Sequence, residues 1–119
     1  MKKCGYLIGV LFFSREVAHR EHLKTKSYAV HKTLDSFYHK VIDRADDIIE
    51  AYQGQYGIVD IPYVDVKMKS NIIENLEIIL AIVEEIRYEA VPKEDTAIQN
   101  IIDEVVGQYV ETLYLLTLQ

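Results

Sequence analysis

Apolar residues recur every three or four positions along most of the chain, which is the period of an α-helix. The first such segment runs from Tyr6 to about His22. A polar break follows, and Ser27 is placed to cap a second, longer helix that continues to about Tyr52. The residues of this second helix that repeat at the helical period, and that we expect to be buried, are Val30, Leu34, Phe37, Tyr38, Val41, Ala45, Ile48, Ile49 and Tyr52.

Two further helices are expected in the second half of the chain. One starts at a Ser70 cap and ends at Val91, because Pro92 pushes the residue before it out of the helical region. The last helix begins at about Asp95 and continues to the C-terminus. The apolar rows, interpreted as plain core, are Ile72, Ile73, Leu76, Ile79, Leu80 and Val83 in the third helix and Ile98, Ile101, Ile102, Val105 and Tyr109 in the fourth.

The connection between the second and third helices, GQYGIVDIPYVDVKMK, is long for a compact domain. Its Ile, Val and Tyr residues predict that it packs down on the helices. Four helices with short first and third joints around one long crossover are typical of an all-α, ferritin-like four-helix bundle. A length of 119 residues indicates a single domain that spans residues 1–119.

The charge of the chain narrows its expected partners. The formal net charge is −6 at pH 7, whereas proteins that neutralise phosphates carry clustered Lys and Arg. Nucleic acid is therefore not an expected ligand. Cys4 is the single cysteine, so no intrachain disulfide can form, which is compatible with the reducing cytoplasm.

The opening sequence, MKKCGYLIGVLFFS, has the lysines and the short apolar run of a secretory signal peptide. No Ala-x-Ala pattern follows, and the apolar run continues into the helix-forming stretch REVAHREH. The run is also shorter than the about 20 apolar residues that cross a membrane. We therefore interpret it as the first helix of a cytoplasmic protein that makes no membrane contact.

Residues 18–50 hold all four histidines of the chain, and several carboxylates accompany them. On a helical wheel with about 100° per residue, His31, Asp35, Asp46 and Glu50 fall in one sector of about 100° that borders the apolar face. Imidazole and carboxylate together form a ligand set for iron or zinc. These residues therefore predict a metal site, with iron as the expected metal and zinc as a substitute.

One helix cannot close this site alone. His31 and Asp46 are separated by about 22 Å of helical rise, whereas the ligands of one metal lie about 2 Å from it. If two copies of the helix cross antiparallel about a two-fold axis, His31 and Asp35 of one copy meet Asp46 and Glu50 of the other, and two equal sites form. His19, near the end of the first helix, is placed to fold back beside His31 and complete the shell.

The spacing of these five residues resembles the ligand spacing of the Dps family, the ferritin-like proteins that protect DNA during starvation. The stretches AVHKTLDSF and DRADDIIE are similar to the second helix of that family in ligands and in apolar framing. The length of the first helix, the long connection and the DTA that opens the last helix extend the resemblance over the whole chain. It implies that His19, His31 and Asp35 come from one subunit and Asp46 and Glu50 from its two-fold partner.

The resemblance also implies a function. A homodimer would assemble into a hollow homododecamer, oxidise Fe(II) as a ferroxidase, commonly with hydrogen peroxide, and store the ferric mineral inside. The lysine-rich N-terminal arm with which some members hold DNA has no counterpart in this sequence, so DNA binding is not expected.

Other interpretations of this region stay open. Glu16 and His19 form a Glu-x-x-His element, but intrachain di-iron bundles use that element twice, and the third and fourth helices lack it. His22 and His39 are expected at the surface. Arg20 follows His19 directly, and a cation beside a ligand can repel a metal. This neighbour motivates a different class of function, a ferritin-like structural or interaction protein without ferroxidase turnover.

Overall fold

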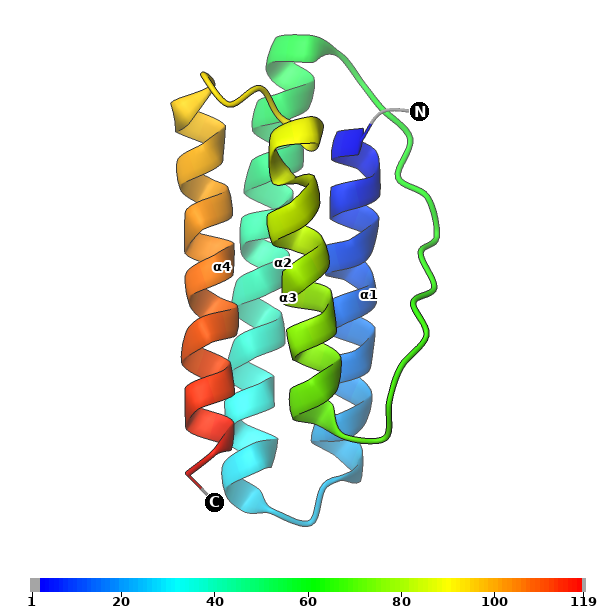
Figure 1. Ribbon diagram of the computed structural model, residues 1–119, viewed down its shortest axis with the longest axis vertical. Coiled ribbons are helices and arrows are strands. Elements are labelled where there is room, and N and C mark those ends of the chain that lie inside the picture. Colours follow the sequence, from blue (N-terminus) through cyan, green and yellow to red (C-terminus); the bar gives the residue numbers. More distant parts are fainter. Residues whose placement is uncertain (1–2, 119) are drawn as a thin grey trace.

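The chain folds into four helices, which a computed structural model describes for residues 3–118 (Figure 1). The helices are α1 (Lys3–Lys24), α2 (Tyr28–Tyr56), α3 (Ile72–Ala90) and α4 (Thr96–Leu116). The described residues contain no β-strand. The predicted fold class, an all-α four-helix bundle with a long crossover between the second and third helices, is confirmed.

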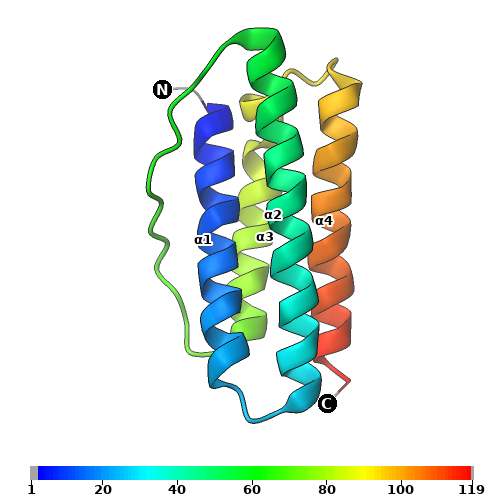
Figure 2. The same cartoon turned by 180° about the vertical axis from the view of Figure 1, so that it is seen from behind.

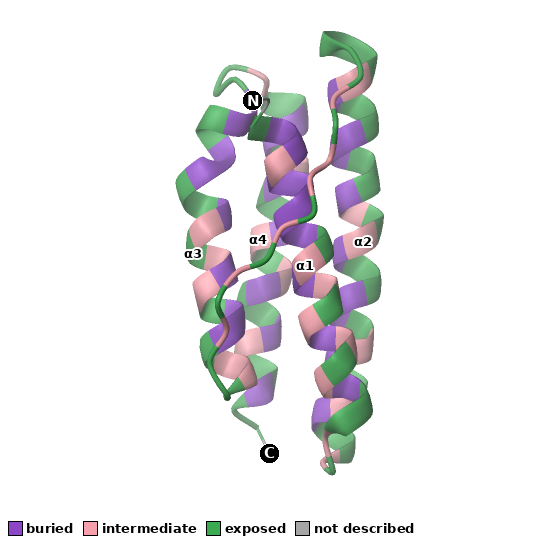
Figure 3. Cartoon of the chain, turned by 90° about the vertical axis from the view of Figure 1, so that its right-hand side faces the viewer, coloured by how far each residue is buried: buried purple, intermediate pink, exposed green. Residues whose placement is uncertain are grey.

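The helices form two antiparallel hairpins, α1 with α2 and α3 with α4 (Figures 1 and 2). Between the hairpins, α1 packs against α3 and α2 packs against α4. The crossover of residues 57–71 returns from the end of α2 to the start of α3 along the outer side of α1 (Figure 3). Because of this return, every pair of packed helices is antiparallel.

The buried face predicted for the second helix is confirmed in full, because all nine residues named for it are buried in α2. In α3 and α4 the predicted rows also point into the core, although Ile72, Ile73, Leu80 and Ile101 are only partly buried. The largest fully buried side chain is Tyr109. Its hydroxyl donates a hydrogen bond of 2.7 Å to Ser14 Oγ, which supplies the polar partner that a buried phenol needs.

The apolar N-terminal run is the first helix of the bundle, as predicted. Among its residues Cys4, Leu7, Ile8, Val10 and Leu11 have no exposed surface. This helix is apolar on more than one side because α2 and α3 cover its inner side and the crossover covers an outer side (Figure 3). None of the four described helices combines the length and the apolar character needed to cross a membrane.

Two glycines of α1 explain how the crossover lies so close to it. A Cβ atom at Gly5 would collide with the backbone oxygen of Asp60, and a Cβ at Gly9 would lie 2.6 Å from the backbone oxygen of Pro62. Gly5 and Gly9 are one turn apart and so share one side of the helix. Val59, Ile61 and Val64 of the crossover pack against the core on that side, as the apolar composition of this segment predicted.

Several helix ends in the structure differ from the predicted ones. The first helix begins at Lys3 and not at Tyr6, because Cys4 and Gly5 are packed inside the bundle. The second helix continues past Gly54 to Tyr56, whose hydroxyl donates a hydrogen bond to Asp95. The predicted end of the third helix at Val91 and the predicted start of the fourth at about Asp95 are confirmed, with Val91 as the C-cap of α3 and Asp95 as the N-cap of α4.

The N-cap of α3 also differs from the prediction. It is Asn71 and not Ser70, since the Asn71 side chain accepts hydrogen bonds from the backbone of Ile73 and Glu74. The last helix ends at Leu116; Gln119, which the sequence places in the fourth helix, lies outside the described residues.

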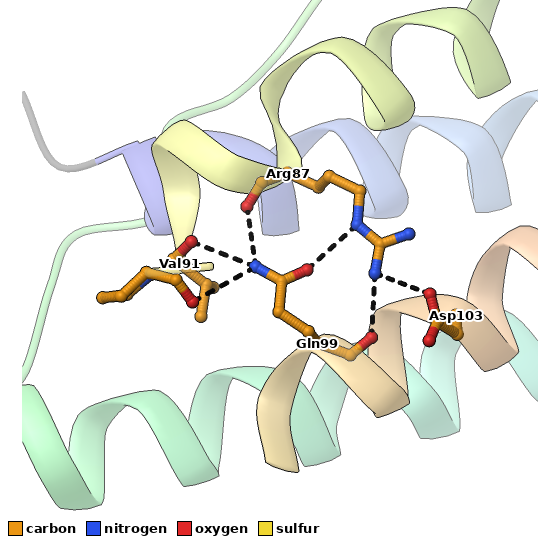
Figure 4. A network of polar contacts seen from close by, with 5 residues as sticks. Arg87, Val91, Gln99 and Asp103 are labelled. Atoms are coloured by element: carbon orange, nitrogen blue, oxygen red, sulfur yellow. Dashed lines mark hydrogen bonds and ion pairs between the residues drawn. The ribbon is translucent and has the colours of Figure 1, made fainter. Parts of the chain in front are cut away.

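A buried polar network ties α3 to α4 (Figure 4). Arg87 donates from Nε to the Gln99 side chain at 2.9 Å, and from one terminal nitrogen to Gln99 O at 2.9 Å and to the Asp103 carboxylate at 2.7 Å. The Gln99 amide donates in turn to the carbonyl of Val91 at 3.0 Å. Arg87 and Gln99 are both buried, and their mutual hydrogen bonds let a cation and an amide enter the core.

Candidate functional site

The histidine-rich region lies where the first hairpin turns. The joint after Lys24 is short, and Ser27 caps α2 by accepting a hydrogen bond of 3.2 Å from the backbone N–H of Val30. The predicted Ser27 cap is thus confirmed. Since α1 and α2 are antiparallel neighbours, this joint places the last two turns of α1 beside the first turns of α2.

His22 and His31 contact each other across this joint by ring stacking and by two reciprocal hydrogen bonds. Their rings stack with centres 3.8 Å apart. His22 Nδ1 donates to the carbonyl of His31 at 2.6 Å, and His31 Nδ1 donates to the carbonyl of His22 at 2.7 Å. A carbonyl can only accept, so both rings carry a proton on Nδ1 when neutral, and each Nε2 then keeps its lone pair. His22 is buried, which corrects its predicted surface position.

Tyr38 stands between the other predicted ligands. The ring of His19 stacks on the Tyr38 ring with centres 4.7 Å apart, and the Tyr38 hydroxyl donates to the Asp35 carboxylate at 3.3 Å. The Arg15 guanidinium lies 5.9 Å from the centre of the same ring. Burial, followed by the Asp35 carboxylate, raises the pKa of Tyr38, so its hydroxyl stays protonated as a hydrogen-bond donor.

The structure therefore places His19, His31 and Asp35 in one cluster at the hairpin end, in which His22 and Tyr38 connect the three and, within residues 3–118, no hydrogen bond or ring contact joins them directly. His19 lies 6.1 Å from His22, measured between ring centres, and His22 stacks on His31. Sequence reasoning found these three residues but missed the role of His22, which holds His31 by ring stacking and hydrogen bonding. The only sequence signal for that role is a histidine at each end of a short joint.

Two charged neighbours of the cluster are already paired. Glu16 accepts a hydrogen bond of 3.0 Å from Arg20 Nε one turn away, so the arginine that follows His19 is engaged with a carboxylate. The Glu-x-x-His element thus has its glutamate in an ion pair. His39 is exposed, as predicted, and its Nδ1 donates to the carbonyl of Asp35 at 2.8 Å.

Asp46 and Glu50 lie farther along α2 and are exposed. Within residues 3–118, neither carboxylate makes a hydrogen bond or an ion pair. In the same described range no group of three or more His, Cys, Asp or Glu side chains could hold a metal ion. The five predicted ligands do not meet inside one copy of the chain, as the helical rise predicted, and their closure between two copies stays a prediction.

An apolar groove opens beside this cluster, between α1, α2 and the crossover. Its volume is about 710 Å³, and its apolar lining includes Phe12 and Phe13 of α1, Ile42 of α2, and Ile61, Tyr63 and Val64 of the crossover. Arg15 and Glu16 also line it. Arg15 therefore belongs to both the groove and the surroundings of Tyr38, so the groove and the histidine cluster are continuous.

The model of a protein family, DUF5856, matches residues 22–116. The chain belongs to DUF5856, a family of unknown function. It is also similar to an uncharacterized 14.6 kDa protein from the mobD-ri intergenic region of Enterobacteria phage T4, with 31% identity over 119 residues that cover 98% of this chain and 90% of the phage protein. No solved structure matches this DUF5856 chain significantly.

The resemblance to the Dps family is therefore wrong, because the chain matches the DUF5856 model and an uncharacterized phage protein, and nothing in either match points to Dps. The reason lies in helix geometry. From His31, the other three α2 residues follow at intervals of 4, 15 and 19, and each interval returns to within about 100° of the same helix face. Polar residues at the border of any amphipathic helix recur in this way. The spacing alone therefore does not identify a family, and the dodecamer and the mineral storage that the resemblance implied have no support in this DUF5856 chain.

Proposed function

We propose that two copies of the chain together bind Fe(II) and oxidise it, with His19, His31 and Asp35 of one copy and Asp46 and Glu50 of the other as ligands. The observation that supports this proposal is the cluster of the first three residues at one end of α2, combined with two exposed carboxylates farther along that helix that have no partner within residues 3–118. The first half supplies two imidazoles and one carboxylate and the second half supplies two carboxylates, so neither half alone provides the five ligands.

The positions of the two halves fit a two-fold pairing of α2. The midpoint between residues 31 and 50 is also the midpoint between residues 35 and 46, and it falls between Lys40 and Val41. When α2 meets a second α2 antiparallel about that point, His31 lies opposite Glu50 and Asp35 lies opposite Asp46, at both ends of the contact. An isologous pair then carries two equal sites.

A bound cation would relieve the repulsion between the facing groups. Asp35 and Asp46 are both carboxylates, and two unit charges of like sign about 4 Å apart repel by about 4 kcal/mol near a protein surface. A divalent ion between them turns this repulsion into attraction. His31 is prepared as a ligand because its Nδ1–H is held by the carbonyl of His22, which leaves Nε2 to bind.

Iron suits this mixed shell better than a softer ion does. Imidazole binds Fe(II), and carboxylate oxygens favour the harder Fe(III) product, so the shell favours loss of an electron to peroxide or dioxygen. The reducing cytoplasm would supply iron as Fe(II), and the single thiol, Cys4, is buried away from the surface. Zinc can occupy the same ligands without redox chemistry.

Anaerobic titration with Fe(II) followed by addition of peroxide tests the proposal. The variant Asp46→Ala/Glu50→Ala should bind iron at least about tenfold more weakly, since it removes two of five ligands, and it should oxidise iron no faster than buffer. Asp43→Ala is the matched control, because Asp43 is an exposed carboxylate of the same helix. If the double variant oxidises iron as fast as the wild type, the assignment is wrong.

A structural or interaction protein without iron turnover is the second candidate function. The apolar groove favours it, because a hollow lined by Phe12, Ile42 and Tyr63 suits a protein surface more than an ion. The ion pair of Arg20 with Glu16 weakens the earlier reason for this candidate, since that cation is not left beside His19 without a partner. A chain that shows no Fe(II) or Zn²⁺ binding by calorimetry would favour the second candidate over the first.

A further inference from the structure

The apolar groove between α1, α2 and the crossover lies on the side of α2 that faces outward. With His31 at zero on the helical wheel, Ile42 falls near 20°, between His31 and Asp35 at about 40°. Ile42 therefore lies at the edge of the polar sector that borders the apolar face, and it lines the groove. Buried Ile49 falls near 0° and buried Tyr38 near −20° on the same wheel, so Ile42 extends the apolar face of α2 outward into the groove, where it is only partly buried.

The groove combines a hollow with a projection. Tyr63 stands at its edge on the crossover with its side chain fully exposed, and Phe12 of α1 is 38% exposed. A surface that carries both an apolar hollow and a protruding aromatic ring can fit a second copy of itself, since each copy offers the ring that the other accepts. A monomer gains nothing from a tyrosine ring that is entirely in water.

The charges at the groove are also self-complementary. Arg15 and Glu16 are neighbours whose side chains are 41% and 48% exposed, and their own ion pair is long at 3.5 Å. The other carboxylate oxygen of Glu16 accepts the hydrogen bond from Arg20, so Arg15 has only the long ion pair. Both signs are thus present side by side. Two copies related by a two-fold axis can set the arginine of one against the glutamate of the other without a contact between like charges.

From these features we infer that the groove is the surface on which two copies of the chain pair. Ile42 lies one and a half positions from the Lys40–Val41 midpoint of α2 that the iron site requires as its axis, and each Tyr63 enters the groove of the other copy. The inference deepens the proposed function, and the placement of the axis rests on it. The hollow, the exposed ring and the paired charges do not depend on any metal.

Sedimentation velocity of the wild-type chain in EDTA tests the pairing in the absence of metal. The wild type should sediment as a dimer. Tyr63→Asp and Ile42→Asp should each raise the dimer dissociation constant by at least about tenfold, because each puts a charge into the apolar contact. Tyr63→Asp cannot disturb the fold through lost packing, since the side chain is fully exposed, and a circular dichroism melt checks Ile42→Asp.

Val110→Asp is the matched control. Val110 is an exposed apolar residue of α4, 56% exposed, and it does not line the groove. This variant should remain as dimeric as the wild type. A wild-type chain that stays monomeric, or a Tyr63→Asp variant that dimerises as tightly as Val110→Asp, overturns the inference.

The two proposals fail separately. If the groove variants lose the dimer and the wild type binds no Fe(II), the iron function is wrong and the pairing surface stands. If the wild type binds iron with the Asp46 and Glu50 dependence given above while the groove variants dimerise normally, the pairing surface is wrong and the iron function stands.

Discussion

His22 and His31 hold the ends of α1 and α2 together by donating to each other's backbone carbonyls while their rings stack 3.8 Å apart. The carbonyl of His22 belongs to the last turn of α1, where no further helical N–H is available to it. The imidazole of His31 therefore caps the C-terminal end of α1, while the backbone of His31 belongs to the first turns of α2. Each histidine is a side-chain donor and a backbone acceptor at the same time.

This arrangement predicts a specific double-mutant result. His22→Ala and His31→Ala each remove one hydrogen bond and the ring contact, and each should lower the free energy of unfolding by about 1–3 kcal/mol. The backbone carbonyls remain in both variants, so the two hydrogen bonds are lost independently. Only the ring contact is shared, and the double variant should be less destabilised than the sum by about 0.5–1.5 kcal/mol.

Urea denaturation of the wild type, the two single variants and the double variant measures this coupling. His39→Ala serves as the control, because His39 is exposed and bonds only within its own helix, and it should change the stability by less than about 0.5 kcal/mol. Strict additivity of the two single changes would show that the stacked rings do not stabilise the hairpin.

The two glycines of α1 and Gly107 of α4 should respond in opposite ways to alanine. In Gly9→Ala the new Cβ would lie 2.6 Å from the Pro62 oxygen, so the crossover must move, at a cost of about 1–3 kcal/mol. In Gly107→Ala nothing lies within 4 Å of the new Cβ, and the helix should gain about 0.5–1 kcal/mol. In thermal melts Gly9→Ala should have a lower melting temperature than the wild type and Gly107→Ala a higher one. Equal melting temperatures would show that the crossover does not rest on α1.

The helices could be predicted from the sequence more fully than the contacts between them. The buried face of α2 follows from a local period, so all nine residues were found. The start of α1 was missed because Gly5 disfavours a helix locally, and only its packing under the crossover explains its place there. The extension of α2 past Gly54 depends likewise on Tyr56 reaching Asp95, a residue far along the chain.

The candidate site was predicted only in part for the same reason. A wheel places His31 and Asp35 on one face of a helix, but it cannot show that His22 stacks on His31, because that contact depends on how the short joint turns. The periodicity that found the face also produced the mistaken family resemblance. Residues at intervals of whole helical turns share a face for any function, so spacing within one helix carries little information about chemistry.

Gln99 and Asp103 should contribute very differently to the network that holds α3 to α4. Gln99→Leu leaves the Nε of buried Arg87 and the Val91 carbonyl without their partners (Figure 4), at about 1–3 kcal/mol for each unsatisfied group. Asp103→Asn alters a carboxylate whose side chain is 62% exposed, so its effect should stay below about 1 kcal/mol. Chemical denaturation measures the loss of free energy of unfolding in each variant. A larger loss for Asp103→Asn than for Gln99→Leu would contradict this prediction.

Alkaline pH should unfold the chain through two buried acids. Burial raises the pKa of the Cys4 thiol from 9.0 to about 12, and it raises the pKa of the Tyr109 phenol above its usual 10.0 although the Ser14 hydrogen bond opposes this. The folded state therefore keeps these protons at pH values where the unfolded state has lost them. The stability should be unaffected by these groups below about pH 9 and should fall as the pH rises from 9.0 toward 12.

Cys4→Ala isolates the thiol in this pH dependence. The variant loses packing at every pH, but between pH 9 and 11 its urea midpoint should fall less steeply than that of the wild type, because Tyr109 and all exposed groups titrate in both chains. The comparison is made between slopes and not between absolute stabilities, so the cavity left by the missing sulfur cancels. Parallel slopes would mean that the Cys4 thiol ionises as readily in the folded bundle as in the unfolded chain, and that its burial at the top of α1 does not restrain it.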